Sequence, residues 1–352
     1  MIFRLTRTKV TVLGDAPVVQ LSREDCVMLG VLFVLSVAAF GNALKAAELP
    51  DEQSWTTNAP IPEVRGVDQG VALASRDGSL IYYVGGSCCS RYANAIDRVW
   101  AYSPDSDSWS SKANIPVVTG IDSLGAAAEL NGFIYVFGGF TGPALALSIL
   151  NTTWIYDETN DVWFQGANMP DYRAGSAVAT DGTVIWVIGG YDGSITSDLT
   201  NTVWMYEPRT DTYQTDFVPM PIHGARIHSV ELPDGTVHVL TGRSGPNLHL
   251  VYDTLSDAWS NAPAMPVSVL DPSVVTDGNL IYVAGGSGPV PRPPGWTQIY
   301  DPATFTWSQG PRMPAPAIDN TSGTIAGGVF YVIGGYDGVA PGMFNYSLLL
   351  FK

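Results

Sequence analysis

The sequence has little positive charge and few of the residues that metal sites and catalytic centres use. Of its 352 residues, 17 are basic and 33 are acidic, which gives a formal net charge of -16. This balance argues against nucleic acid or an anionic membrane surface as a partner. The chain has only 4 histidines and 3 cysteines, and no zinc-binding, phosphate-loop or dinucleotide motif is present. We therefore expect neither a metal site nor a cofactor.

Charged residues make up only 14% of the chain, whereas glycine and proline are frequent, with 37 and 25 copies. So few charges exclude a disordered, charge-rich chain, and so many helix breakers exclude a helical bundle. Hydrophobic residues reach 46%. This composition favours an all-β protein with many tight turns.

The first 47 residues differ from the rest and are set aside from the fold. Four basic residues precede an uncharged, apolar stretch over 27–40, which is shorter than the about 20 residues of a membrane span. We expect a cleaved export signal, cut near Ala46 or Ala47, and hence a periplasmic, extracellular or cell-surface protein. An uncleaved membrane anchor over 1–47, or a true start at Met28, remains open.

From Glu48 onward one pattern recurs: an apolar strand that ends in paired glycines. A sixth, degenerate copy ends at Thr241-Gly242. The five complete pairs are Gly85-Gly86, Gly138-Gly139, Gly189-Gly190, Gly285-Gly286 and Gly334-Gly335. Steps of about 50 residues between copies indicate a repeat architecture.

A second landmark is a tyrosine followed seven residues later by another aromatic residue. The pairs are Tyr102 and Trp109, Tyr156 and Trp163, Tyr206 and Tyr213, Tyr252 and Trp259, and Tyr300 and Trp307. Turn-forming residues lie between them, so each pair predicts two antiparallel strands joined by a short loop. A proline, usually as Met-Pro, follows seven or eight residues later.

Together these residues resemble the kelch repeat, and the resemblance covers about residues 50 to 352 six times. Each kelch repeat forms one four-stranded blade of a β-propeller, so the resemblance implies an all-β, six-bladed propeller over 48–352. The strand over 53–57 should complete the last blade by pairing with 344–350, which removes the free edges. The repeated glycines and aromatics are then expected to serve assembly.

Residues that break the repeat are the candidates for function. In kelch propellers that bind partners, the ligand face is built by the loops after the glycine pairs and those from Met-Pro to the innermost strand. On this chain the implied binding rim contains Arg65, Asp68, Asp122, Tyr172, Arg173, Tyr191, Arg226, His228, Arg243, Asp271, Asp319 with Asn320, and Tyr336. Arginines can pair with carboxylates or phosphates, and aspartates can accept hydroxyl groups. The alternative is that Arg173 and Arg226 only bridge neighbouring blades.

Cys88 and Cys89 are adjacent, and Cys26 lies in the expected leader. Export would favour a disulfide between the neighbours, although closing it distorts the intervening peptide. A vicinal disulfide and two reduced thiols both remain open.

Two functions from different classes are consistent with these residues. The first is an exported module that binds a protein or glycan through the rim, with membrane contact only through an uncleaved N-terminal segment. The second resembles the periplasmic kelch-type sugar epimerases acting on sialic acid, for which Arg173, Arg226, His228 and Asp271 would supply the arginine, acid and base. Because no motif specific to that group is present, we favour binding over catalysis.

Overall fold

The structure is a computed structural model with two compact units, Met1–Glu52 and Gln53–Lys352. It describes residues 9–13, 16–20, 54–64, 66–88, 94–117, 120–121, 126–142, 148–193, 199–240, 242, 245, 247–288, 295–314, 318, 320–337 and 341–350. In the first unit, β1 (Lys9–Leu13) and β2 (Ala16–Gln20) form an antiparallel hairpin. The apolar stretch over 27–40 lies outside the described residues. No described helix has the length and apolar character needed to cross a membrane.

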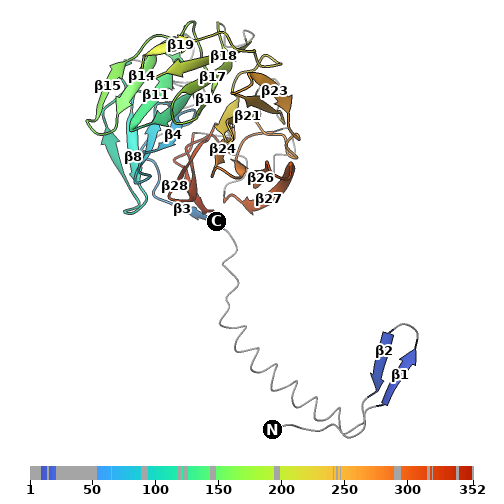
Figure 1. Ribbon diagram of the computed structural model, residues 1–352. Helices are drawn as coiled ribbons and strands as arrows, with labels where there is room; N and C mark the ends of the chain where they lie inside the picture. The colour runs from blue at the N-terminus through green and yellow to red at the C-terminus, as the bar shows by residue number, and fades with distance from the viewer. Residues whose placement is uncertain are drawn as a thin grey trace. The chain divides into compact units, whose positions relative to one another are not determined.

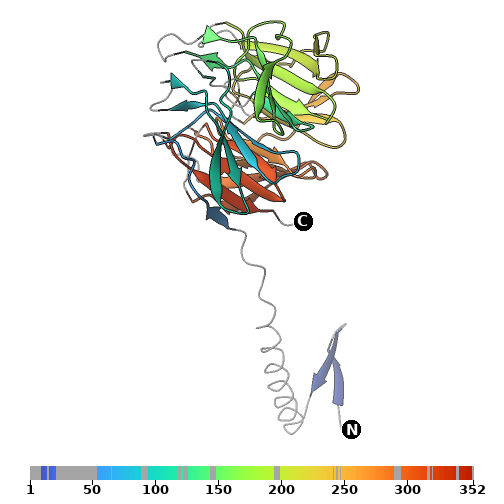
Figure 2. The same ribbon diagram turned by 90° about the vertical axis from the view of Figure 1, so that its left-hand side faces the viewer.

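The described strands of the second unit form six four-stranded antiparallel sheets, which stand as blades around a common axis (Figures 1 and 2). The six-bladed propeller expected from the repeats is therefore confirmed. From the axis outward, the blades are β4 (Val71–Ala74), β5 (Ile81–Val84), β8 (Val99–Ser103) and β9 (Ser108–Lys112); β10 (Ala127–Leu130), β11 (Phe133–Phe137), β14 (Thr153–Asp157) and β15 (Val162–Gln165); β16 (Ala177–Thr180), β17 (Ile185–Tyr191), β18 (Leu199–Glu207) and β19 (Thr212–Gln214); β20 (His228–Glu231), β21 (Thr236–Leu240), β22 (His249–Asp253) and β23 (Ala258–Asn261); β24 (Ser273–Thr276), β25 (Ile281–Ala284), β26 (Trp296–Asp301) and β27 (Thr306–Arg312); and β28 (Ser322–Ala326), β29 (Val329–Ile333), β30 (Asn345–Leu349) and β3 (Trp55–Thr57). We number them blades 1 to 6 in this order.

Two short hairpins extend the connections beyond the second strands. They are β6 (Ser87–Cys88) with β7 (Asn94–Ala95) in blade 1, and β12 (Phe140–Thr141) with β13 (Ser148–Ile149) in blade 2.

The ring is closed by the strand expected to close it. In blade 6, β3 pairs with β30, with Trp55 opposite Leu348 and Thr57 opposite Tyr346. The Trp55 ring packs on Phe330, with centroids 5.3 Å apart. Because the first and last strands of the propeller share one sheet, unfolding either end also breaks blade 6.

The core lies between the blades, where aromatic side chains of neighbouring sheets meet. Tyr82 of blade 1 contacts Tyr156 of blade 2 edge to face, with centroids 5.6 Å apart, and Tyr135 of blade 2 contacts Tyr206 of blade 3 at 5.8 Å. All four are buried. Such side chains each bury about 150–250 Å², so the repeated tyrosines stabilise the contacts between blades.

The tyrosine and the aromatic residue seven positions later lie directly opposite each other in the outer hairpin of five blades, as predicted. In four of these blades the fifth residue after the tyrosine is an aspartate with a left-handed φ of 46° to 54°. We call these four residues the aspartate clips: Asp107, Asp161, Asp211 and Asp257.

Each aspartate clip joins two blades. Its Oδ1 accepts the tyrosine hydroxyl at 2.7 Å in all four cases. The same oxygen accepts a backbone N–H of the preceding blade, for example that of Ala113 at 2.7 Å from Asp161. The indole of Trp163 donates to the carbonyl of the same Ala113 at 2.8 Å. A clip therefore holds one short segment of the neighbouring blade by both its N–H and its C=O.

The glycine pairs hold the opposite ends of neighbouring blades together. The first glycine of each complete pair has a φ of 59° to 76°, and the second a φ of 87° to 113°. A Cβ on Gly138 would lie 2.1 Å from the carbonyl oxygen of Arg173 in the next blade, so only glycine fits. The N–H of Gly139 donates to that carbonyl at 2.8 Å, and the other four pairs make the same bond. These bonds fix the loops that lead into the innermost strands.

Candidate functional site

The two sets of loops expected to build a ligand face lie side by side at one end of the central channel, which we call the mouth. The residue three positions before an innermost strand pairs with the residue that follows the glycine pair of the same blade. Asp68 and Ser87 exchange two backbone hydrogen bonds at 3.1 and 2.8 Å, and Ala174 and Tyr191 pair in the same way. The Ser87 hydroxyl also donates to Asp68 Oδ1 at 2.5 Å. The mouth is therefore built on fixed backbone.

The backbone turns into the left-handed region two residues before the innermost strand in five blades. The residues are Gln69, Gly175, Arg226, Asp271 and Asn320, with φ between 53° and 64°. This conformation costs about 1–2 kcal/mol for a residue other than glycine. Hydrogen bonds between blades hold it, since Gln69 N donates to Asn320 O at 3.1 Å and Arg226 N to Gly175 O at 2.7 Å. The backbone turn is therefore a shared feature of these five blades, whereas the side chain at this position differs from blade to blade.

Three consecutive blades place a connected set of polar side chains at this position, which we call the mouth triad: Arg226, Asp271 and Asn320. Arg226 Nε donates to Asp271 Oδ1 at 2.8 Å, and its Nη2 donates to Asp271 Oδ2 and to Asn320 Oδ1. All three residues are 4% to 5% exposed. A buried, two-pronged pair of this kind is neutral as a unit and rigid. By holding Asn320 Oδ1, Arg226 also fixes the direction of the Nδ2 group of that amide.

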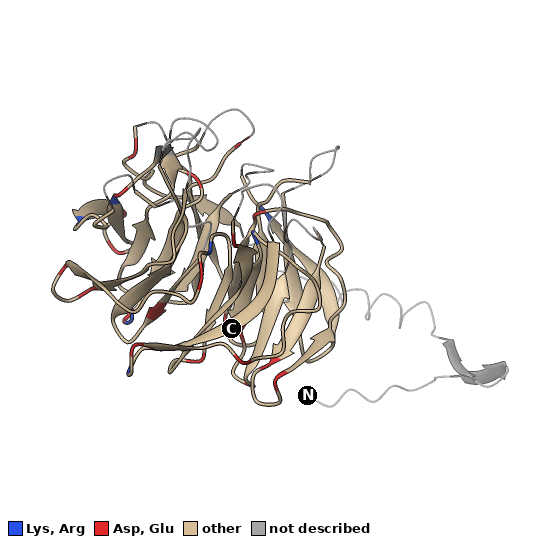
Figure 3. Cartoon of the chain, turned by 90° about the horizontal axis from the view of Figure 1, so that it is seen from above, with Lys and Arg blue, Asp and Glu red and all other residues tan. Residues whose placement is uncertain are grey.

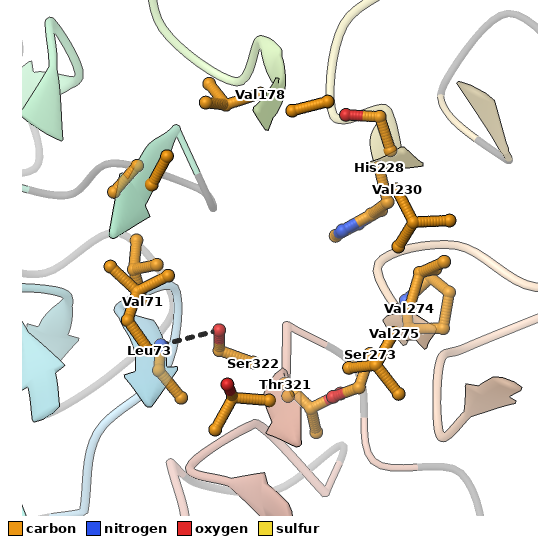
Figure 4. A pocket seen from close by; sticks show the side chains of 18 of the residues that line it. Val71, Leu73, Val178, His228, Val230, Ser273, Val274, Val275, Thr321 and Ser322 are labelled. Carbon is orange, nitrogen blue, oxygen red and sulfur yellow. Dashed lines mark hydrogen bonds between the residues drawn. The ribbon is translucent and has the colours of Figure 1, made fainter. Parts of the chain in front are cut away.

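The mouth opens into a cavity of about 530 Å³ along the axis, lined by all six innermost strands. Figure 4 looks into this cavity and shows the imidazole of His228 projecting into it from the start of β20. Four lining atoms are buried without a hydrogen-bond partner: His228 Nε2, Ser229 Oγ, Glu231 Oε2 and Asn320 Nδ2. Burial, with the Arg226 charge, lowers the pKa of His228 to about 4. His228 is therefore a neutral hydrogen-bonding group at physiological pH.

Comparisons with known proteins agree with this architecture. The family model described as KLHDC2/KLHL20/DRC7 Kelch-repeats domain matches residues 70–286, and a Kelch motif model matches 270–314. The first match alone spans more than half of the chain. The chain belongs to the kelch-repeat family.

The kelch propeller is similar to segments of larger proteins. It is 25% identical to Beta-scruin of Limulus polyphemus over 64% of the chain, 29% identical to Kelch-like protein 36 of Bos taurus over 50%, and 31% identical to Kelch-like protein 23 of Homo sapiens over 44%. The aligned segments cover 24%, 29% and 27% of those relatives. The chain thus spans about a quarter of the length of the curated relatives it matches.

In the kelch propeller Arg173 is buried, at 3% exposure, and fastens the loop beside it. Its guanidinium lies 4.1 Å from the ring centroid of Trp204, an attractive cation–π geometry. Nη1 donates to the carbonyl of Tyr172 at 2.6 Å and Nη2 to Thr202 Oγ1 at 3.1 Å. Burial lowers the pKa of Arg173. Arg173 therefore holds the backbone of Tyr172, a residue that is 52% exposed.

Large apolar side chains are exposed on the loops of the mouth side. Besides Tyr172, they include Val64 in the loop leading to blade 1 and Met343 before β30, at 93% and 44% exposure. They belong to the connections of blades 3, 1 and 6, so a partner that covered the mouth would meet apolar surface on both sides of the axis.

The structure brings some of the expected rim residues together and separates others. Arg226, His228 and Asp271 meet at the mouth, and Arg226 bridges blades, the role offered as the alternative to ligand contact. Tyr191 is 2% exposed and packs on Phe140, with ring centroids 5.7 Å apart, so its side chain belongs to the core. Tyr336 pairs through its backbone with Pro341. Residues that lie outside the described part are Arg65, Asp122, Arg243, Asp319 and Cys89.

Other contributions to the site were missed from the sequence. Gln69 and Ser229 line the cavity without belonging to a recognisable motif. Only their position in the repeat could have pointed to them, since Gln69 stands two residues before the innermost strand β4 and Ser229 is the second residue of the innermost strand β20. For Cys88 only its place in β6 is described, so the vicinal disulfide stays a prediction, and mass measured without reductant would test it. Among the described residues, no group of three or more histidine, cysteine or acidic side chains is arranged to hold a metal.

Proposed function

We propose that this kelch propeller is a binding module whose partner is a protein that docks on the mouth. The observation that carries the proposal is the amide of Asn320, a 4% exposed side chain whose Nδ2 has no partner while its Oδ1 is held by Arg226. A buried donor left without an acceptor costs about 1–3 kcal/mol. A partner that supplies a carbonyl or carboxylate oxygen would recover that energy on binding.

The mouth side also offers contact area for a protein partner. Exposed Tyr172, Val64 and Met343 supply apolar contact area, and tyrosine is among the residues that dominate binding energy at interfaces. The Arg173 contacts already fix the backbone of Tyr172, which reduces the entropy lost on docking.

Binding is favoured over sugar chemistry because three of the four residues offered for catalysis are already engaged, which leaves only His228 with a ring nitrogen that has no partner. Arg226 and Asp271 bind each other in a buried pair, and Arg173 is buried against Trp204. Carbohydrate recognition at the same face is an outcome that a glycan array would reveal.

A photo-crosslinking experiment tests the proposal. A photoreactive amino acid at position 172 should capture one protein in the native host. The same amino acid at position 255, in the outer hairpin of blade 4 where Leu255 is 87% exposed, serves as the control. The captured partner, once purified, should bind Tyr172→Ala and Asn320→Ala at least tenfold more weakly than the unmodified chain, and Leu255→Ala equally well. Equal capture from both positions, or unchanged binding by both mouth variants, would reject the mouth as the docking surface.

We also propose that the chain is exported, on the basis of the basic and apolar pattern of residues 1–47. N-terminal sequencing of the protein recovered from outside the cytoplasm tests this. A chain that begins near residue 48 supports cleavage, whereas recovery of the full chain from the cytoplasm contradicts export.

A further inference from the structure

The cavity has a second end, opposite the mouth, that the proposed function does not use. The innermost strands run away from the mouth, so Glu231 stands three residues beyond His228 on β20, about 10 Å further along the axis by the rise of a strand. Between the two ends the walls carry both aliphatic and hydroxyl side chains, and Figure 4 labels Val71, Val178 and Val274 as well as Ser273, Thr321 and Ser322 around the cavity. Its volume of about 530 Å³ is that of a small-ligand site.

Two carboxylates line this far end. Glu231 comes from blade 4, and its Oε2 is buried without a hydrogen-bond partner. Glu129 comes from blade 2, and its Oε1 accepts the N–H of Gly132 at 2.7 Å. Both side chains are half-buried. No lysine or arginine stands among the described residues that line the cavity.

The charges near Glu231 make its position unfavourable for an isolated carboxylate. Burial, followed by the negative charges of Asp181 and Asp234, raises the pKa of Glu231 to about 7. Burial likewise raises the pKa of Glu129, opposed by the Gly132 N–H and the charge of exposed Arg76. A cation with N–H donors that enters this end would reduce the repulsion between Glu231 and the nearby aspartates and would also supply the missing hydrogen bond to Glu231 Oε2.

The turns that follow four innermost strands add to the negative field at the far end. Each contains an aspartate whose Oδ1 accepts backbone N–H groups of its own turn: Asp77, Asp181, Asp234 and Asp277. Figure 3 shows how few basic positions interrupt the acidic ones over the chain. A cleft of one sign with low-dielectric walls concentrates oppositely charged ligands.

We propose that the far end of the cavity binds a primary alkylammonium group, the chemistry of a lysine side chain or a free aliphatic amine. The ammonium carries three donors on a compact charge, so it can donate to several acceptors at once. Glu231 Oε2 and Ser229 Oγ, which lie on one strand and lack partners, would accept two of these hydrogen bonds, and Glu129 of blade 2 adds to the negative charge around the cavity. The methylene chain would lie against Val178 and Val274. A planar guanidinium fits less well, because its donors are fixed in one plane.

The test is calorimetric titration of the full chain with hexylamine, with hexan-1-ol as the uncharged probe of equal length. We expect hexylamine to bind at least tenfold more tightly than hexanol. Glu231→Gln should weaken the binding of hexylamine at least tenfold. Val178→Phe, which narrows the cavity from another blade, should weaken this binding by the same factor. Glu207→Gln removes an equal charge from β18, in the third strand of blade 3, and should leave binding unchanged. Thermal unfolding of each variant separates a lost site from a lost fold.

Proton release gives a second readout. Because Glu231 is partly protonated near neutral pH, ammonium binding at pH 7 should release a fraction of a proton, seen as a binding enthalpy that depends on the ionisation enthalpy of the buffer. Glu231→Gln should abolish this dependence. Hexylamine that binds no better than hexanol, or binds Glu231→Gln unchanged, would overturn the proposal and leave the mouth untouched.

The source of the ammonium is decided by a further probe, a blocked tripeptide with a central lysine. Binding of the peptide with the same response to Glu231→Gln identifies a partner's lysine as the ligand. Binding of hexylamine alone identifies a free amine. Both results support the site, and failure of both probes removes it.

Discussion

Blade 5 lacks the aspartate clip that blades 1 to 4 share, and both halves of the interaction are missing there. The fifth residue after Tyr300 is Phe305, which is 67% exposed and has a φ of 56°. Trp307 Nε1 donates to the carbonyl of Pro263 at 2.8 Å, so the residue that would supply the backbone N–H is a proline and has none. We predict that Phe305→Asp together with Pro263→Ala builds the fifth clip and stabilises the propeller.

The expected gain follows from the four natural clips. A hydrogen bond to a charged group contributes about 1.5–3 kcal/mol when buried and less at the surface, so we take about 1 kcal/mol for each of the two bonds. Aspartate also tolerates the left-handed backbone better than phenylalanine, which adds up to about 1 kcal/mol for Phe305→Asp alone. Pro263→Ala alone should cost about 0.4–1 kcal/mol because the unfolded chain gains freedom. The double variant should therefore exceed the sum of the single variants by about 1 kcal/mol.

Urea unfolding of the four proteins in this cycle measures that coupling directly. As the reverse experiment, Asp161→Ala in blade 2 should lose about 2–3 kcal/mol, because it removes the acceptor of both Tyr156 and Ala113 and places alanine at a φ of 54°. A coupling below about 0.5 kcal/mol, with Asp161→Ala also near neutral, would refute the view that the clips stabilise the contacts between blades.

Two further predictions concern buried polar groups. His238 Nδ1 lies 2.8 Å from His249 Nε2, and burial, reinforced in His249 by His238, lowers the pKa of each histidine to about 4. The unfolded chain takes up protons at these histidines from about pH 6.5 downward, whereas the folded chain does not. The free energy of unfolding should therefore fall as the pH drops through 6.5, by about 2 kcal/mol per histidine at pH 5, and level off below pH 4. Unfolding at pH 8 and pH 5 should show this loss relative to His238→Val/His249→Phe, and parallel profiles would contradict it. Asp271→Ala removes the carboxylate that pairs with buried Arg226 and should lower the free energy of unfolding in urea by about 3–5 kcal/mol. The double variant Arg226→Met/Asp271→Leu, which replaces both charges, should recover most of that loss. If Asp271→Ala lies within about 1 kcal/mol of the parent, the pair is dispensable for stability.

The blades could be predicted from the sequence because their signals are local. Strand, glycine pair and turn lie within one repeat, and the spacing of Tyr102 and Trp109 corresponds to direct opposition across a short hairpin. The closing strand followed because the repeats begin with an outer strand and end without one. All of this depends on which residues are neighbours along one blade, and a repeat makes that visible.

The site could be predicted only as far as the loops that carry it. Arg226 binds Asp271, 45 positions away, and Asn320, 94 positions away. The repeat shows that these residues occupy equivalent places in their blades. Their pairing, however, depends on a left-handed backbone turn, and no glycine stands at these three positions to indicate that turn in the sequence. The clip aspartates repeat in the sequence as clearly as the tyrosines do, yet their backbone partners lie 39 to 48 positions upstream. Contacts between blades are the part that local pattern does not contain.

The contact between blades 4 and 5 shows how one sequence combines these effects. This contact has no clip, and it is crossed by the Arg226–Asp271 pair and by His249, whose ring meets Tyr300 edge to face at 4.6 Å. Charge pairing at the mouth and the neutral histidine pair therefore support a contact between blades that has no clip. Because the mouth triad is part of this contact, a change that weakens the contact also disturbs Asn320. Building the fifth clip should make Asp271→Ala less costly, since the two blades would then be held at a second point.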